Sequence, residues 1–300
     1  MKALITGGAG FIGSNLVDAL VGRGDDVLVL DDLSTGRREN VADGVAIVEA
    51  DVSDADAVER AFDLHRPGAV FHLAAQVDVR RSVAEPALDA RVNVEGTVVV
   101  LDAARRHGAR VVFSSTGGAI YGDTDLLPTP EGAPRRPLAP YGQSKAAAED
   151  YCALYARLHD ADVVALRYAN VYGPRQDPQG EGGVVAIFCD HARRNEPAAV
   201  FGEGRQTRDF VYVDDVVDAN LAATERGRAG HAYNIGRGEE TSVLELATMV
   251  GVPVEHRPPR AGEVLRSCLD PSLAGRDLGW KAAVGLAEGI DRTHDWMRAR

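Results

Sequence analysis

Short runs of apolar residues alternate with longer amphipathic stretches along the first half of the chain. The apolar runs predict strands, and the stretches of roughly 10 to 20 residues between them, such as Asp54–Leu64, predict helices. This alternation is typical of a parallel, doubly wound α/β sheet, in which every strand ends at the same edge. The strands expected are Lys2–Thr6, Asp26–Leu30, Val45–Glu49, Ala69–Leu73, Arg110–Ser114 and Asp162–Arg167.

After Asn170 this alternation stops. Residues Tyr172–Gly183 are rich in Gly, Pro and Gln, so they predict a loop. We expect a first domain over residues 1–170, to which roughly 205–240 returns, and a smaller α/β domain over 171–300, with a cleft between the two. The elements expected in the second half are the strands Ala199–Phe201 and Tyr233–Ile235 and the helices Val213–Thr224 and Ser242–Val250.

The charge balance limits the partners. The chain has 33 Lys and Arg against 45 Asp and Glu, a net charge of −12, so we expect neither nucleic acid nor an anionic membrane as a partner. The three cysteines form no CxxC motif, which argues against a zinc site or a disulfide framework. Only Met1–Ile5 precede Thr6, and no apolar run of about 18 uncharged residues occurs. We therefore expect a cytoplasmic protein.

A glycine-rich turn follows the first predicted strand. Gly7, Gly10 and Gly13 form a GxxGxxG pattern directly before a predicted helix. Gly7 allows the tight turn, Gly10 lets backbone N–H groups approach a pyrophosphate, and Gly13 lets the helix pack closely on the strand. The partial positive charge of the helix N-terminus favours the same anion. The pattern predicts a dinucleotide site on a Rossmann sheet.

Asp31 indicates which dinucleotide binds. It follows the second predicted strand, where a carboxylate accepts hydrogen bonds from a ribose diol and repels a 2′-phosphate. We therefore expect NAD rather than NADP. Arg37 and Arg38 argue for NADP, although two arginines in a solvated loop need no phosphate partner. Asp51–Val52, after the third strand, is expected beside the adenine.

A tyrosine and a lysine lie four residues apart at the start of a predicted helix. Tyr141 and Lys145 therefore share one helix face, and the strand that leads to Thr116 ends at the same sheet edge. A tyrosine base must lose its proton near pH 7, about three units below its free pKa of about 10, which takes about 4 kcal/mol. We expect the Lys145 ammonium and a cationic nicotinamide to supply that energy. Thr116 is placed to donate a hydrogen bond to the same substrate oxygen.

Several longer motifs carry a family resemblance. With Tyr141 and Lys145, they resemble the extended short-chain dehydrogenase/reductase family over nearly the whole chain, and the last three look most like its UDP-galactose 4-epimerase group. The motifs are TGGAGFIGS from Thr6, HLAAQ at His72–Gln76, NVEGT at Asn93–Thr97, SSTGGAIYG at Ser114–Gly122, ANVYGPRQDP at Ala169–Pro178 and RDFVYVDD at Arg208–Asp215.

The resemblance implies an NAD-dependent 4-epimerase of UDP-hexoses, which oxidises C4 transiently and returns the hydride to the other face of the sugar. Tyr141 would be the base, Lys145 would bind the nicotinamide ribose, and Thr116 would contact the C4 oxygen. Asn93 would order the loop beside the nicotinamide. The NAD contacts implied are Gly7, Gly10, Phe11, Ile12, Asp31, Leu33, Ser34, Thr35, Gly36, Asp51, Val52, Leu73, Ala74, Ala75, Asn93, Ser114, Tyr141, Lys145 and Tyr168.

The same resemblance implies that the second half binds the UDP-sugar, with no metal. Asn170, Arg208 and Arg260 would contact the diphosphate, Glu263 the uridine ribose and Phe201 the uracil. Ser267 lies where narrow-pocket relatives carry a bulky Tyr, so N-acetylated UDP-hexoses are expected to fit. The substrate contacts implied are Ser115, Thr116, Asn170, Val184, Val185, Phe201, Arg208, Arg260, Glu263 and Ser267.

Other activities remain open at this point. A UDP-glucuronate 4-epimerase would differ only in the pocket for C6. An NDP-sugar 4,6-dehydratase would carry Asp-Glu after the threonine, whereas Thr116 is followed by Gly117-Gly118. A UDP-glucuronate decarboxylase would carry Glu near the same place. A non-catalytic NAD sensor would lack Tyr141 or Lys145.

The resemblance also implies a homodimer, held by two helices of each copy. We expect these helices to be Leu88–His107 and Ser144–His159. Their apolar stripes would face the partner copy or pack inside the monomer. The stripes are Val94, Val98 and Leu101 on the first helix and Ala148, Tyr151, Tyr155 and Leu158 on the second.

Overall fold

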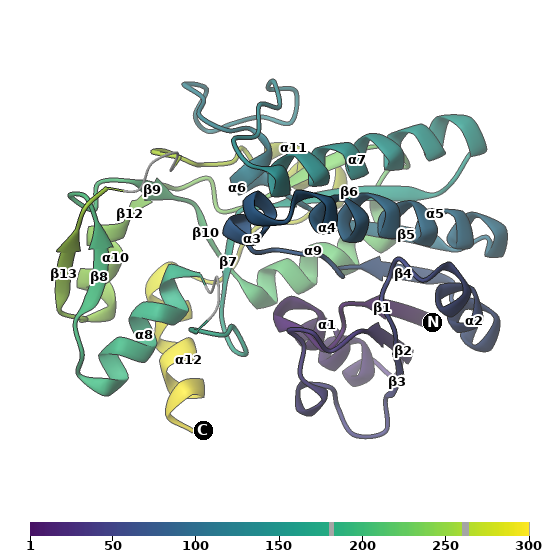
Figure 1. The fold of residues 1–300 in the computed structure, drawn as a ribbon, viewed down its shortest axis with the longest axis horizontal. Helices are drawn as coiled ribbons and strands as arrows, with labels where there is room; N and C mark the ends of the chain where they lie inside the picture. Colours follow the sequence, from purple (N-terminus) through teal and green to yellow (C-terminus); the bar gives the residue numbers. More distant parts are fainter. Residues whose placement is uncertain (180–182, 260–263, 300) are drawn as a thin grey trace.

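A computed structural model describes residues 1–179, 183–259 and 264–299. Its centre is a seven-stranded parallel sheet in the order β11-β6-β5-β4-β1-β2-β3 (Figure 1). The six strands expected in the first half are present, each within two residues of its predicted bounds. The strands are β1 (Lys2–Thr6), β2 (Asp26–Asp31), β3 (Ala46–Glu49), β4 (Ala69–His72), β5 (Arg110–Thr116), β6 (Val163–Tyr168) and β11 (Ala232–Ile235).

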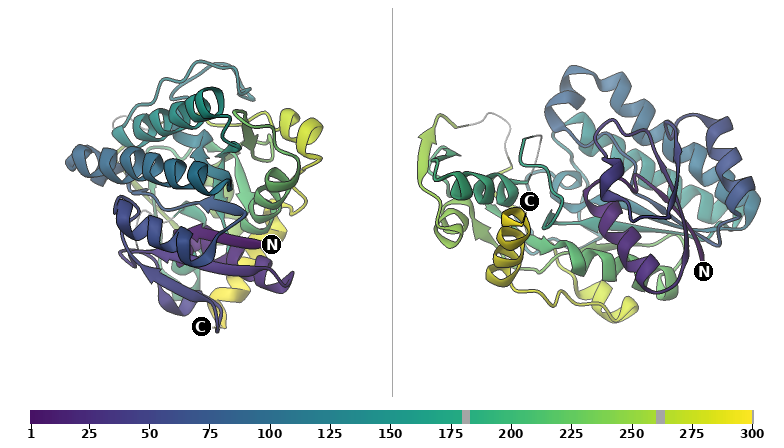
Figure 2. Two further views of the ribbon diagram at one scale, coloured as in Figure 1. Left: turned by 90° about the vertical axis from the view of Figure 1, so that its right-hand side faces the viewer. Right: turned by 90° about the horizontal axis from the view of Figure 1, so that it is seen from below.

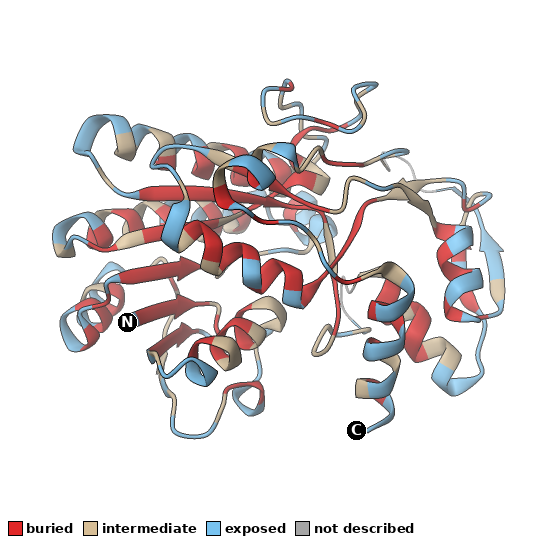
Figure 3. Ribbon diagram, turned by 180° about the vertical axis from the view of Figure 1, so that it is seen from behind, coloured by how far each residue is buried: buried red, intermediate tan, exposed pale blue. Residues whose placement is uncertain are grey.

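Helices cover both faces of this sheet, which explains why its strands are apolar throughout. In β1, Leu4 packs into the hydrophobic cluster on one face and Ile5 into the cluster on the other. Buried residues therefore run along the strands, while the outer helix faces are exposed (Figure 3). One face is covered by α1 (Phe11–Gly22), α9 (Val213–Arg226) and α11 (Ser272–Leu278), the other by α2 (Ala55–His65), α5 (Gly96–His107) and α7 (Pro140–His159).

The strand order reverses between β1 and β4. From β1 the chain proceeds to β2 and β3 on one side, and from β4 to β5 and β6 on the other. In a parallel sheet such a reversal opens a crevice at the carboxyl ends of the strands, where ligands bind. Thr6, Asp31, His72 and Thr116, which end four of these strands, therefore share one edge.

Most of the second half forms a smaller body beside the sheet, at the left of Figure 1 and in the right panel of Figure 2. It has its own hydrophobic cluster, which includes Phe188, Leu246 and Ile290. Strand β11 nevertheless pairs with β6 in the main sheet, and helix α9 packs on one face of that sheet. The second half of the chain therefore contributes to both bodies. The elements of the smaller body are α8 (Val184–Arg194), β8 (Ala198–Phe201), α10 (Val243–Val250), β13 (Val254–Arg257) and α12 (Leu286–Arg298).

Short elements connect the two bodies and surround the sheet edge. Strand β7 pairs in parallel with β10, and β9 pairs in antiparallel with β12. No helix in the described ranges is long and apolar enough to cross a membrane. The short elements are η1 (Arg38–Asn40), α3 (Val79–Ala84), α4 (Pro86–Ala90), α6 (Gly117–Ile120), β7 (Asn170–Tyr172), β9 (Thr207–Arg208), β10 (Phe210–Tyr212) and β12 (Thr241–Ser242).

The helix expected over Leu88–His107 contains a break in its regular hydrogen bonding. Between α4 and α5, Arg91–Glu95 forms a π-helical turn, η2. Two residues of the expected stripes pack inside the monomer, the second of the two alternatives: Leu101 and Ala148 are buried in the cluster that α5 and α7 form with the sheet.

Candidate active site

The glycine-rich loop between β1 and α1 lies at the reversal of strand order. Gly7 adopts a φ of +71°, and a Cβ there would lie 2.6 Å from the backbone nitrogen of Ala74. A Cβ on Gly13 would lie 2.1 Å from the Gly7 carbonyl oxygen. Both positions therefore require glycine, for a left-handed turn and for close approach. This is the cradle that a dinucleotide pyrophosphate needs above the N-terminus of α1.

Asp31 is fixed by the backbone around it. The Ala9 N–H donates to its Oδ2 and the Leu33 N–H to its Oδ1, each at 2.9 Å. The side chain is buried, and burial raises its pKa, while these two hydrogen bonds lower it. Each oxygen keeps a lone pair for a ribose hydroxyl, so the carboxylate fits an NAD ribose.

The two arginines that argued for NADP are held by carboxylates. Arg37 lies 3.5 Å from Asp177, and Arg38 lies 3.0 Å from Glu49. All four side chains are exposed, so these pairs add little stability. They show that neither guanidinium needs a 2′-phosphate as its partner. The arrangement favours NAD.

Tyr141 and Thr116 meet at the sheet edge. Thr116 is the last residue of β5, and Tyr141 follows Pro140 in the first turn of α7. The Thr116 hydroxyl lies close enough to the Tyr141 hydroxyl to lower its pKa. An oxygen placed against both hydroxyls would lose its proton to one and accept a hydrogen bond from the other.

Lys145 lies one helical turn after Tyr141 and is 2% exposed. Its ammonium nitrogen lies 4.4 Å from the centre of the Phe113 ring. Within the described part of the chain, no hydrogen bond or ion pair holds this nitrogen, so its three N–H groups remain available. Burial lowers the Lys145 pKa to about 8. A buried ammonium with free donors is suited to bind a ribose diol.

In the chain alone, without the nicotinamide that the expectation included, the Tyr141 pKa is not lowered. Burial of the phenol and the negative charge of Asp89 raise its pKa to about 12, and only the Thr116 hydrogen bond opposes them. The lysine was expected to stabilise the phenolate, but its charge is not among these causes. The lowering needed for catalysis must therefore come from a positive charge that a bound ligand brings to the phenol.

His72 is a member of the site that sequence reasoning left without a role. It is buried at the end of β4, and its ring bonds to Thr6 Oγ1 at 2.7 Å and Thr97 Oγ1 at 3.0 Å. Thr97 donates its own proton to the Asn93 carbonyl, so it accepts from His72 Nε2–H. Burial lowers the His72 pKa to about 3, so the ring stays neutral. It fixes the loop after β4 without adding charge.

Asn93 lies in the π-helical turn η2 and joins two parts of the site. Its Oδ1 accepts from the Gln76 N–H at 2.8 Å, and its Nδ2 donates to Ser144 Oγ at 3.0 Å. Ser144 in turn donates to the Tyr141 carbonyl at 3.0 Å. The loop after β4 is thus linked to the first turn of α7. Turns of this kind often occur at functional sites.

Two of the predicted diphosphate contacts, Asn170 and Arg208, lie where β7, β9 and β10 meet. The side-chain oxygen of Asn170 is buried without a partner in the described residues, as expected of a group that a ligand completes. Arg208, in β9, is half-buried and donates to the Thr207 carbonyl at 2.8 Å. Ser267 donates its N–H to the same carbonyl at 3.2 Å, so it lies beside Arg208. Phe201, half-buried at the end of β8, lies in the smaller body.

Asp209 is the residue that assembles these segments, and the sequence pattern gave no sign of it beyond its place in a motif. It is fully buried, and its carboxylate accepts from the backbone N–H groups of Arg237, Gly238 and Leu269 at 2.9, 3.1 and 3.2 Å. Its own carbonyl accepts from the Asn170 N–H at 2.9 Å. Burial raises its pKa, and the three N–H groups oppose that rise.

A sequence model of the NAD dependent epimerase/dehydratase family matches residues 3–236. The chain belongs to this family. It is 47% identical over 310 residues to the UDP-glucose 4-epimerase of Mycolicibacterium smegmatis, with 99% of each chain covered. It is similar to the solved UDP-glucose 4-epimerase of Thermotoga maritima with UDP-glucose (46% identity, TM-score 0.97, 100% of this chain and 99% of that one). It is also similar to that of Thermus thermophilus in complex with NAD (44%, 0.94, 99% of both).

Membership of this family confirms the resemblance drawn from the motifs, but not every expected contact lies in the crevice. Ser115 is buried and donates to Glu149 at 2.9 Å, on the other side of β5 from Thr116. Val185 is 1% exposed in the core of the smaller body, and only Val184 is partly exposed. Tyr168 is buried, and its hydroxyl donates to Asn220 Oδ1 at 2.9 Å. Arg260 and Glu263 lie outside the described residues.

The remaining predicted cofactor contacts do lie near the crevice. Leu33, Ser34, Thr35 and Gly36 form the loop after β2, where a Cβ on Gly36 would lie 2.9 Å from Asp31 Oδ1. Asp51 and Val52 follow β3. Leu73, Ala74 and Ala75 follow β4, against the glycine-rich loop, and Phe11 and Ile12 start α1, where they also touch the smaller body.

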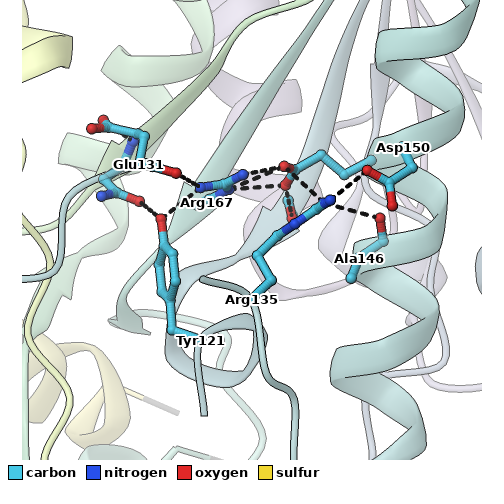
Figure 4. Close-up of polar contacts among 9 residues, drawn as sticks. Tyr121, Glu131, Arg135, Ala146, Asp150 and Arg167 are labelled. Atoms are coloured by element: carbon cyan, nitrogen blue, oxygen red, sulfur yellow. Dashed lines mark hydrogen bonds and ion pairs between the residues drawn. The ribbon is translucent and has the colours of Figure 1, made fainter. Parts of the chain in front are cut away.

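The hydroxyl of Ser115 belongs to a buried ionic network instead (Figure 4). Arg167 in β6 donates to both oxygens of Glu149, at 3.1 and 3.0 Å, and to the Tyr121 hydroxyl at 2.6 Å. Arg135 adds a second cation, 3.5 Å from Glu149. The network ties α7 to β5, to β6 and to the segment that follows α6. It therefore positions the helix that carries Tyr141 and Lys145.

Proposed function

We propose that this protein is an NAD-dependent 4-epimerase of UDP-hexoses, an isomerase that interconverts UDP-glucose and UDP-galactose. One observation carries the proposal: Tyr141, beside Thr116, lies one helical turn from Lys145, whose buried ammonium has no hydrogen-bond or ion-pair partner among the described residues. The glycine-rich loop and Asp31 lie at the same sheet edge. Relatives named UDP-glucose 4-epimerase, at 44–47% identity over the whole chain, support the same activity.

NAD, when bound, supplies the hydride acceptor for C4 of the sugar. Tyr141 takes the proton of the C4 hydroxyl, and Thr116 donates a hydrogen bond to that oxygen. Lys145 binds the ribose next to the reacting ring with the N–H groups that the protein leaves free. Asn170, Arg208 and the segment of Ser267 hold the diphosphate and sugar from the smaller body.

A dehydratase would need a further acid or base beside C5 and C6. Thr116 is followed by α6, whose four residues Gly117–Ile120 carry no titratable side chain. Gly117 packs against Leu269, where a Cβ would come within 2.3 Å of that side chain, so an acidic residue would not fit there. These features favour epimerisation, in which the sugar loses no group.

The decisive test incubates the purified protein with UDP-galactose and measures UDP-glucose by chromatography. Equilibration of the two sugars without added redox partner is expected. Tyr141→Phe should keep its bound NAD and lose turnover by orders of magnitude. A 4-keto-6-deoxy product, conversion of UDP-glucuronate alone, or more than about a tenth of wild-type turnover in Tyr141→Phe would contradict the proposal.

We also propose a homodimer in the cytoplasm. Three apolar side chains of α7 are exposed: Tyr151 at 39%, Leu154 at 38% and Leu158 at 64%. Val94 and Val98, beside them on η2 and α5, are half-buried. Such a face supports helix packing against a second copy. The three cysteines are free and buried, which supports a reducing compartment.

A further inference from the structure

One buried acid near the site has no role in the steps above. Asp89, in α4, is 1% exposed. Its Oδ1 accepts from Gln76 Nε2 at 3.0 Å and from Asn93 Nδ2 at 3.1 Å, while its Oδ2 is buried without a partner. None of the ion pairs in the described part of the chain includes it. A buried carboxylate without a paired cation is costly, so its presence calls for a physical reason.

Asp89 holds together the two segments that flank the reacting groups. Gln76 belongs to the loop after β4, and Asn93 to the turn η2, whose amide also bonds to Ser144 in the first turn of α7. Asn93 Nδ2 has two hydrogens but three acceptors, because it also lies 2.9 Å from the Gln76 carbonyl. The carboxylate therefore competes for a shared donor and fixes where the asparagine points.

The charge of Asp89 acts on the two reacting groups. It raises the pKa of Lys145 and that of Tyr141. Glu149, one turn further along α7, is engaged by Arg167 and Arg135. The other charged groups of the elements packed against Asp89 are exposed or uncharged: Arg80, Arg81, Arg91 and Glu95 are exposed, and His72 is neutral. The Cys152 thiol stays protonated because burial raises its pKa.

We propose that Asp89 is a positioning residue of the active site: through Gln76 and Asn93 it fixes the loop after β4 to the start of α7, which carries Tyr141 and Lys145. The proposal rests on the function proposed above. It assigns a role to the buried oxygen that the mechanism leaves unused. Removal of the charge stabilises the neutral amine of Lys145 and also the phenolate of Tyr141.

The charge is tested with Asp89→Asn, which keeps an oxygen for both amides. Activity needs the Tyr141 phenolate, which sets the acid limb of the kcat profile, and the Lys145 ammonium, which sets the alkaline limb. Both limbs should move to lower pH by roughly half a unit or more. The control Asp63→Asn removes the same charge from a carboxyl that is 70% exposed on α2, and its profile should not move. A profile of Asp89→Asn that superimposes on the wild type overturns the proposal.

The hydrogen-bonding part is tested with Gln76→Ala, which removes a partner of Asp89 but keeps its charge. Turnover should fall about tenfold or more, with both limbs in place and NAD retained. An unchanged kcat in Gln76→Ala overturns the positioning role. This outcome can be measured even if Asp89→Asn does not fold.

A readout without turnover separates this proposal from the proposed function. Tyrosinate absorbance of the NAD-loaded protein is titrated in wild type and in Asp89→Asn, each after subtraction of its Tyr141→Phe counterpart. Tyr141 should ionise at lower pH in Asp89→Asn. If it does so although the wild type interconverts no UDP-hexose, the proposed function fails and the role of Asp89 stands. If it does not shift, the role of Asp89 fails by itself.

Discussion

At the scale of single residues, the site consists of groups that the fold keeps from water before any ligand arrives. Lys145 is buried over the Phe113 ring with its donors free, and Tyr141 is held against Thr116. Both pKa shifts favour the neutral form of the side chain, since the lysine pKa is lowered to about 8 and the tyrosine pKa is raised to about 12. Near pH 7 the burial of the Lys145 ammonium lowers the stability of the NAD-free protein, whereas Tyr141 is neutral in both the folded and the unfolded chain.

The first prediction concerns that loss of stability. Lys145→Met fills a similar volume without a charge, so the NAD-free protein should be more stable by on the order of 1–3 kcal/mol near pH 7, as seen in its denaturant midpoint. Epimerisation should be lost. Because burial lowers the Lys145 pKa to about 8, the unfolded chain binds the extra proton above that pH. Wild-type stability therefore rises from about pH 8 toward pH 10, and the gain in Lys145→Met should shrink over the same range.

Lys281→Met is the control, since it removes a lysine from the surface of the molecule. Its free energy of unfolding should stay within about 0.5 kcal/mol of the wild type, both near pH 7 and near pH 10. A Lys145→Met variant that is less stable than the wild type at pH 7 would show that the ammonium is paired after all.

A second prediction at this scale concerns whether the sugar pocket accepts an N-acetyl group. Ser267 is half-buried beside β9, and we propose that its small side chain sets the width of the sugar pocket. UDP-N-acetylglucosamine should be accepted within about tenfold of UDP-glucose in kcat/KM, and Ser267→Tyr should reject the N-acetyl sugar, because overpacking costs about 1–3 kcal/mol. Both sugars are assayed with both proteins. If the variant discriminates no better than the wild type, another residue sets the width.

At the scale of elements, the sequence predicted best those helices and strands whose structure follows from their own local pattern of apolar residues. The apolar runs of the main sheet give its strands within two residues, because helices cover both faces of the sheet and all of these strands except the edge strand β3 are mostly buried. The pairs β7–β10 and β9–β12 were not predicted. They are two or three residues long and form only because Asp209 and its neighbours bring distant segments together.

The same distinction holds for the site. Residue types and spacing were enough to name Tyr141, Lys145, Thr116 and Asp31. Burial, which no spacing reveals, decides that the Tyr141 pKa rises and that Ser115 turns away to Glu149. The partners of His72 and Asp89 come from other elements, so their roles also required the folded chain.

The contact between the glycine-rich loop and α1 gives a prediction for one element. Gly13→Ala should push α1 away from the loop, because its Cβ would lie 2.1 Å from the Gly7 carbonyl oxygen. NAD affinity, measured by calorimetry, should fall about tenfold or more, since about 1.4 kcal/mol is a factor of ten. Gly22→Ala is the matched control at the other end of the helix, where a Cβ meets nothing within 4 Å. Equal affinities of the two variants would contradict this account of the loop.

At the scale of the whole molecule, two bodies share one crevice, and one outer face remains apolar. Leu158→Arg places a charge on the exposed side of α7, near the end of the helix that forms the proposed dimer face. Sedimentation at micromolar protein should show a dimer for the wild type and a monomer for the variant, because a buried unpaired charge is costly. Leu64→Arg, on α2 at a position 73% exposed, should remain dimeric. A monomeric wild type would refute the dimer itself.

The position of β11 has a consequence for how the chain is made. This strand covers the free edge of β6, yet it is reached only at Ala232–Ile235, after α8, β8 and α9. On the ribosome, the first six strands can assemble while that edge still exposes unpaired N–H and C=O groups for some 60 residues of further synthesis, several seconds at roughly 5–20 residues per second. Until β11 pairs with β6, the nascent protein exposes a strand edge that can pair with other chains. Chaperones or rapid completion of the sheet then prevent aggregation. The native sheet closes late, by a contact between residues far apart in sequence, and such contacts form slowly.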